Sequence, residues 1–160
     1  MLPIGDLAVG RPRPILYAAA ALSLAAALIH LWVTPEHFEE WWGYGVFFLV
    51  SALAQLLYVP LLLRRPSRTV WLLGVGGNLA IVLLYLLTRT AGIPLFGPEA
   101  GEVEGVGIID VCATTSELGI VAALGALLLR GLSTERRRLV LLVVAVVLVS
   151  VGHLVHLLLR

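Results

Sequence analysis

The chain has 160 residues, of which 60% are apolar and 13% are charged, whereas soluble domains carry about 45 to 50% apolar and about 25% charged residues. This composition excludes an ordinary soluble domain and predicts an integral membrane protein. The formal net charge is +1, so the chain lacks the concentrated basic surface that nucleic acid binding requires. A single cysteine, Cys112, excludes an intrachain disulfide and a thiolate metal cage.

Five apolar runs are each long enough to cross about 30 Å of hydrocarbon at about 1.5 Å of rise per residue. They predict transmembrane helices at about residues 14–33, 44–63, 69–88, 107–129 and 139–159. The sequence shows no internal repeat, and its length fits one domain. The expected fold is therefore all-α: a single bundle of five transmembrane helices.

The segments between these runs carry helix start and stop signals. Thr34, Pro35 and Glu36 are typical of a helix start, so the second helix is expected to begin about ten residues before its apolar run. Gly131 and Ser133 predict a stop and a new start before the fifth run. The segment 89–106 contains two prolines and four glycines, and we expect it to act as a lid.

The arginines indicate an orientation. They cluster before the first run, between the second and third runs, and between the fourth and fifth, whereas the two alternate segments are rich in glutamate. Because arginine-rich short loops stay in the cytoplasm, we expect a cytoplasmic N-terminus and a C-terminus outside. The stretch HFEEWW at residues 37–42 is similar to small polytopic membrane proteins of GC-rich bacteria, but this likeness points to no named family and no property is carried over from it. The expected location is the bacterial cytoplasmic membrane.

Polar side chains recur at helical spacing within the apolar runs, and such side chains usually face the interior of a bundle. Most of them fall in the outer half of the predicted spans, while the inner half is nearly all apolar. This distribution predicts a polar pocket that opens to the outside and is closed toward the cytoplasm. The residues expected at its entrance or in its lining are His37, Glu40, Tyr44, Gln55, Asn78 and Thr114.

Imidazoles and carboxylates without thiolates are the donor set of Zn, Fe, Mn or Cu(II). We therefore predict a transition-metal site in the outer half with His30, Asp110, His153 and His156 as ligands. Glu117 lies near the predicted midplane and is the candidate catalytic or proton-handling residue. A metal with an open position would activate water or oxygen beside a lipid-soluble substrate.

Three other interpretations fit the same residues. The carboxylates and histidines can form a proton or ion path in a transporter, or His30 can hold haem together with His153 or His156. The polar residues can also simply join helices in a structural accessory subunit. The expected partners are the lipid bilayer, a small lipophilic molecule or metal ion, and a second copy of the chain in a homo-oligomer; whether the protein is an enzyme is left open.

Overall fold

Four long helices form the part of the chain described by the computed structural model, which covers residues 13–92, 97–98 and 100–142. They are α1 (Arg13–Glu40), α2 (Trp42–Arg64), α3 (Arg68–Thr90) and α4 (Ile108–Arg130). Each is long and apolar enough to cross a membrane. The four predicted spans between residues 14 and 129 are thereby confirmed, and within the described ranges the fold is all-helical.

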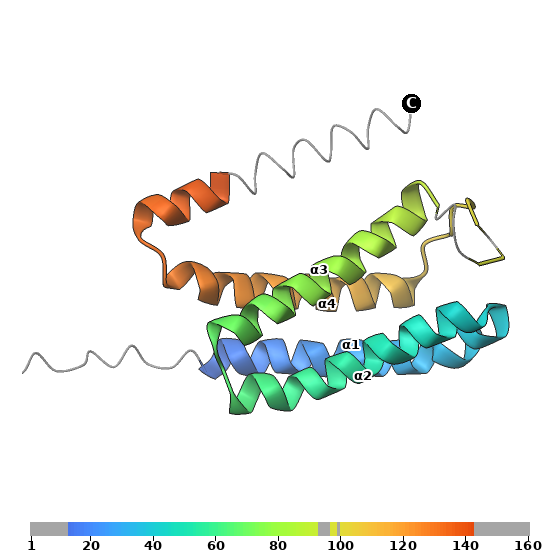
Figure 1. Ribbon diagram of the computed structural model, residues 1–160, viewed down its shortest axis with the longest axis horizontal. Coiled ribbons are helices and arrows are strands. Elements are labelled where there is room, and N and C mark those ends of the chain that lie inside the picture. Colours follow the sequence, from blue (N-terminus) through green and yellow to red (C-terminus); the bar gives the residue numbers. More distant parts are fainter. Residues whose placement is uncertain (1–12, 93–96, 99, 143–160) are drawn as a thin grey trace, which may run out of the picture.

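The helices are arranged as two hairpins (Figure 1). One hairpin is α1 with α2, which turn at Trp41, and the other is α3 with α4. The hairpins join where α1 packs against α4, whereas α2 and α3 touch each other least of the neighbouring pairs. After the turn at residues 65–67, α3 diverges from α2, so that the bundle is wider at its other end.

The expected early start of the second helix is wrong. The helix α1 runs without a break through Thr34 and Pro35 to Glu40, so His37 and Glu40 belong to α1. Pro35 cannot donate to the carbonyl of Leu31, but the Thr34 hydroxyl donates to the His30 carbonyl at 2.7 Å. The Thr34 hydroxyl is therefore engaged with the preceding turn of α1 instead of capping a new helix.

The other helix ends follow familiar rules. The Ser67 side chain accepts a hydrogen bond from the Val70 amide at 3.3 Å and caps α3. Gly131 caps the end of α4 as predicted, and a further helix occupies residues 134–142 just after Ser133. The remainder of the predicted fifth span, 143–159, lies outside the described residues.

A cluster of apolar side chains closes the end of the bundle that carries the turn at 65–67. Its centre is Leu62, Ile120 and Leu124, each 0% exposed. Small residues on α1, Ala19 and Ala20, let the helices approach closely there. Many large apolar side chains elsewhere on the helices are exposed, as expected for surfaces that face lipid rather than water. The described residues therefore form an all-helical bundle with four candidate membrane-spanning helices, as in a membrane protein.

Candidate functional site

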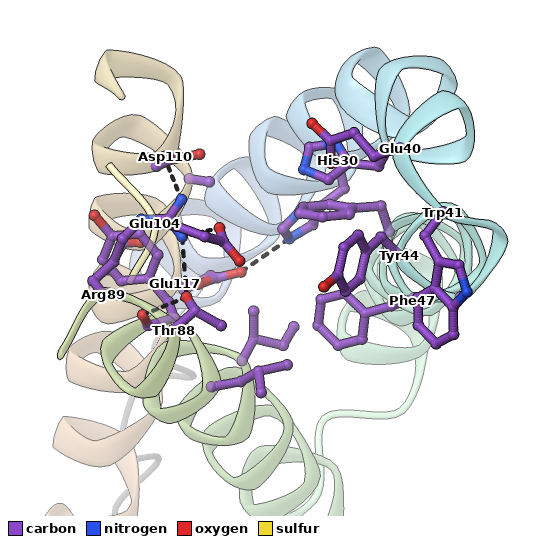
Figure 2. A pocket seen from close by; sticks show the side chains of 18 residues that line it. His30, Glu40, Trp41, Tyr44, Phe47, Thr88, Arg89, Glu104, Asp110 and Glu117 are labelled. Atoms are coloured by element: carbon purple, nitrogen blue, oxygen red, sulfur yellow. Dashed lines mark hydrogen bonds and ion pairs between the residues drawn. The ribbon is translucent and has the colours of Figure 1, made fainter. Parts of the chain in front are cut away.

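A pocket of about 310 Å³ lies at the end of the bundle opposite to the apolar cluster. Its walls come from the last turns of α1 and α3 and the first turns of α2 and α4, with one residue, Glu104, from the segment before α4. Figure 2 shows the side chains of the α3–α4 hairpin on one side and those of the α1–α2 hairpin on the other. The pocket thus occupies the space between the two diverging hairpins.

A histidine and a glutamate join the two hairpins at this pocket. The His30 Nε2 atom of α1 lies 2.9 Å from the Glu117 Oε1 atom of α4, and the side chains are 3% and 1% exposed. The ring of Phe48, from α2, packs against His30 with centroids 5.7 Å apart. A buried polar pair of this kind is costly unless both members are satisfied, so the site fixes the relative position of α1 and α4.

The hydrogen bonding of this pair is incomplete. Among the described residues, the Nδ1 atom of His30 is buried and has no hydrogen-bond partner. If the imidazole is neutral and Nε2 donates to Glu117, Nδ1 is an acceptor without a donor. If the imidazole is protonated instead, Nδ1 is a donor without an acceptor. In both states the Nδ1 atom of His30 lacks a hydrogen-bond partner among the described residues.

An arginine organises a second polar group on the α3–α4 side. Arg89 Nη2 donates to Asp110 Oδ2 at 2.8 Å, and Nη1 forms an ion pair with Glu104 and donates to the Thr88 hydroxyl at 3.0 Å. Asp110 also accepts a hydrogen bond from the Gly107 amide at 3.0 Å. The guanidinium therefore ties α3 to α4 and to the segment in front of α4, and both carboxylates share one positive charge.

The rim on the opposite side is aromatic and acidic. The exposed Glu40 ends α1, and Trp41 and Tyr44 follow it at the start of α2 (Figure 2). The rings of His37 and Phe48 are in tilted contact with centroids 3.9 Å apart, and the His37 Nδ1–H donates to the Val33 carbonyl at 2.8 Å. His37 is thus held in place by the helix that carries it.

The structure brings seven of the eleven predicted site residues to this one pocket. They are His30, His37, Glu40, Tyr44, Asp110, Thr114 and Glu117. The predicted ligands His153 and His156 lie outside the described residues. The pocket itself was predicted from the polar spacing, and its closed opposite end agrees with the apolar inner half of the sequence.

Gln55 and Asn78 are buried in a different place. Gln55 Nε2 donates to Asn78 Oδ1 at 2.8 Å, and the Ser23 hydroxyl donates to Gln55 Oε1 at 2.6 Å. Asn78 in turn donates to the Gly74 carbonyl at 2.7 Å. These three side chains form a hydrogen-bonded layer across α1, α2 and α3 rather than part of the pocket wall. Gln55 and Asn78 line a second cavity, between α2 and α3, instead of this pocket, because helical spacing shows which face of a helix points inward but not which cavity that face meets.

The described residues contain no group of three histidine, cysteine or acidic side chains placed to hold a metal ion. His30 and Asp110 both line the pocket, yet His30 binds Glu117 and Asp110 binds Arg89. Glu117 and Arg89 therefore occupy the side chains of His30 and Asp110 that a metal ion would need as ligands. A metal site that includes His153 and His156 stays a prediction.

Sequence reasoning missed several lining residues. Arg89 was placed in a loop, although it is the one arginine among the glutamates of its side, which is a usable signal. The pocket is also lined by the aromatic side chains of Trp41, Phe47, Phe48 and Tyr85. Aromatic residues are common near a membrane interface, so their presence in the sequence does not indicate a site.

Comparison with known protein families, curated proteins and solved structures finds no match. The functional argument therefore depends on the geometry of the pocket.

Proposed function

We propose that this protein binds a small amphiphilic cation, such as an amine or a quaternary ammonium compound, in the pocket between its two hairpins. The observation that supports this most directly is the buried carboxyl group of Glu117, whose hydrogen-bond partner among the described residues is His30 rather than Arg89. A bound cation would place a positive charge beside this carboxyl group.

The balance of charged groups favours a cation over an anion. Four acidic residues line the pocket, and the one arginine among its described residues is Arg89. Because Arg89 already contacts Glu104 and Asp110, its charge is offset within that group. A cavity with excess acidic groups and low-dielectric walls concentrates positive ligands.

The aromatic walls favour an organic cation over a hydrated metal ion. Trp41, Tyr44, Phe47 and Phe48 come from one short stretch around the start of α2, and Tyr85 stands on the α3 side. A cation over an aromatic face gains about 0.5 to 2 kcal/mol, and aromatic cages are used to recognise quaternary ammonium groups. The Arg89 guanidinium lies 5.0 Å from the Tyr85 ring centroid, so one aromatic ring of the pocket already contacts a cationic side chain.

A matched pair of probes tests this proposal. Benzyltrimethylammonium and neopentylbenzene have nearly the same shape but differ in charge. Calorimetric titration of the protein in nanodiscs, with empty nanodiscs subtracted, is expected to show at least about tenfold tighter binding of the cation, a difference of about 1.4 kcal/mol. Equal affinities would overturn the proposal.

Two variants test whether Glu117 is responsible for the binding of the cation. Glu117→Gln keeps the size of the side chain and removes its charge, so it is expected to weaken cation binding by at least about tenfold and to leave the neutral probe unchanged. Glu135→Gln is the matched control, because Glu135 is exposed at the start of the helix at 134–142, far in sequence from every lining residue. Unchanged cation binding in Glu117→Gln would contradict the assignment of this carboxylate.

We also propose that the pocket opens on the outer side of a bacterial cytoplasmic membrane, as the distribution of arginines indicates. Cysteine labelling tests this in a Cys112→Ala background. A membrane-impermeant maleimide added to intact cells is expected to label Glu36→Cys, which is exposed near the pocket end, and not Ser133→Cys, which is exposed at the closed end. The reverse pattern would place the pocket in the cytoplasm.

A metal site is the second candidate, and the unpartnered Nδ1 atom of His30 is the observation that favours it. Elemental analysis of protein purified without chelator is expected to find near-stoichiometric Zn, Fe, Mn or Cu that is lost in His153→Ala. A Soret band in the visible spectrum would identify haem instead. Metal-free, colourless protein that binds benzyltrimethylammonium would leave the cation pocket as the function.

A further inference from the structure

A second cavity, of about 200 Å³, lies between α2 and α3. Its walls carry small and aliphatic side chains from both helices, among them Ala54 on α2 and Gly77 on α3, and Gln55 and Asn78 also line it. The Gln55 amide nitrogen already donates a hydrogen bond to the Asn78 amide oxygen. We call this cavity the α2–α3 groove.

The groove adjoins the pocket. Ile81 lines both cavities, and it lies on α3 one turn beyond Asn78, toward the pocket end. In the other direction the Tyr58 hydroxyl donates to the Val70 carbonyl at 2.9 Å and joins α2 to α3. From Gly74 to Ile81 the groove extends for about 10 Å along α3, at about 1.5 Å per residue.

The groove opens at the side of the described part of the bundle. Val50 and Leu73, which line it from the two helices, are 58% and 61% exposed. Since α2 and α3 touch each other least of the neighbouring helices, this seam is where the described bundle is open along its side. An apolar path within the hydrocarbon layer suits an alkyl chain better than a solvated group.

Taking the proposed cation pocket as given, we infer that the natural ligand is a single-chain amphiphile whose cationic head occupies the pocket and whose hydrocarbon chain lies in the α2–α3 groove. The ligand class then narrows from small organic cations in general to long-chain amines or ammonium compounds. Such a ligand reaches the pocket from the bilayer, between α2 and α3, rather than from water through the rim.

A chain-length series tests this inference with the protein in nanodiscs. The probes are butyl-, octyl- and dodecyltrimethylammonium, measured by displacement of radiolabelled benzyltrimethylammonium. Longer chains also partition into the bilayer, but wild type and variants experience the same partitioning, so differences between them report on the groove. Wild type is expected to bind the dodecyl probe more tightly than the butyl probe after correction for partitioning.

Two glycines on α3 provide a matched pair of variants. A side chain added at Gly76 or at Gly77 meets nothing within 4 Å, but only Gly77 lines the groove. Gly77→Leu is expected to weaken dodecyl binding by about tenfold, as the loss of contact for about two methylene groups predicts, and to change butyl binding by less than about twofold. Gly76→Leu is expected to change neither.

A second variant fills the groove from the other helix. Ala54→Leu on α2 is expected to reproduce the selective loss of dodecyl binding, which keeps the inference testable if Gly77→Leu does not fold. The inference is overturned if filling variants weaken butyl and dodecyl binding equally, or weaken neither. If no alkylammonium probe binds, the proposed cation pocket itself is wrong; if butyl binding depends on Glu117 but chain length has no effect in the variants, only the groove assignment fails.

Discussion

The two ends of the bundle use similar apolar helices and differ in what lies between them. At the closed end, Ala19 and Ala20 bring helices together around Leu62, Ile120 and Leu124, with no exposed area left on the three larger side chains. At the pocket end the hairpins diverge, and carboxylates, imidazoles and aromatic rings fill the space only in part. Because lipid tails are as apolar as leucine, close packing rather than exclusion from water holds membrane helices together.

This contrast separates two tasks. The closed end packs tightly and contributes most directly to stability, whereas the pocket end holds a space open with a few polar contacts that bridge it. The His30–Glu117 bond is the main such contact between the hairpins, since it joins α1 to α4. Substitutions at the two ends should therefore affect stability and binding in different proportions.

The largest effect is expected from His30→Leu. This change leaves the buried Glu117 carboxyl without its partner and is expected to lower the free energy of unfolding by about 3 to 5 kcal/mol. The double variant His30→Leu, Glu117→Leu is expected to recover most of that loss, because both polar groups are then removed. Denaturation in detergent measures both values. A double variant no more stable than His30→Leu would show that the pair contributes through packing instead.

A change at the closed end should affect stability without affecting the pocket. Leu124→Ala creates a cavity among fully buried side chains and is expected to lower the free energy of unfolding by about 2 kcal/mol. The folded fraction is expected to bind benzyltrimethylammonium within about twofold of wild type. A parallel loss of binding would mean that the two ends are mechanically coupled.

A smaller effect is expected where α3 passes α2 and α4 closely. A Cβ atom at Gly74 would collide with the Tyr58 hydroxyl and a Leu124 methyl group. Gly74→Ala is therefore expected to cost about 1 to 2 kcal/mol, despite the better helix propensity of alanine. Gly76→Ala, at a position with open space, is the control and is expected to be neutral or stabilising. Thermal unfolding of the three proteins distinguishes these outcomes.

The smallest effect is expected from Glu104, which forms one of the two ion pairs of Arg89. Glu104 is 37% exposed, and screened ion pairs of this kind contribute less than about 1 kcal/mol. Glu104→Gln should therefore leave the free energy of unfolding nearly unchanged. It should accelerate amide hydrogen exchange in residues 101–107, because the Glu104 amide donates to the Thr88 carbonyl beside this ion pair. The exposed Glu102 provides the control, and equal acceleration in Glu102→Gln would rule out a specific role for Arg89.

The helices could be predicted from the sequence far better than their contacts. Apolar length fixes a membrane span almost regardless of its neighbours, and the four observed spans agree with the expected ones to within a few residues except at the end of α1. There, Thr34 and Pro35 are typical of a helix start in water-soluble proteins, but the helix continues and the Thr34 hydroxyl donates back to the His30 carbonyl within α1.

The pocket could be predicted as a region, and its internal pairing could not. Helical spacing showed that His30 and Glu117 face inward, but they are 87 residues apart, and only the packing of α1 on α4 determines that they meet. Similarly, Asp110 was expected to bind a metal with His30, whereas the position of α3 provides it with Arg89. Such partners depend on the order of the helices around the bundle, and the spacing of residues within one helix gives no information about that order.

Pro35 gives the pocket two parts with different rigidity. Because the Leu31 carbonyl lacks its helical donor, the backbone of α1 is weakest between His30 at the base of the pocket and His37 and Glu40 at its rim. A bend at such a position moves the last turns of a helix relative to the rest. The residue that interrupts the backbone hydrogen bonding of α1 therefore lies between the buried histidine that contacts Glu117 and the two side chains at the mouth of the pocket.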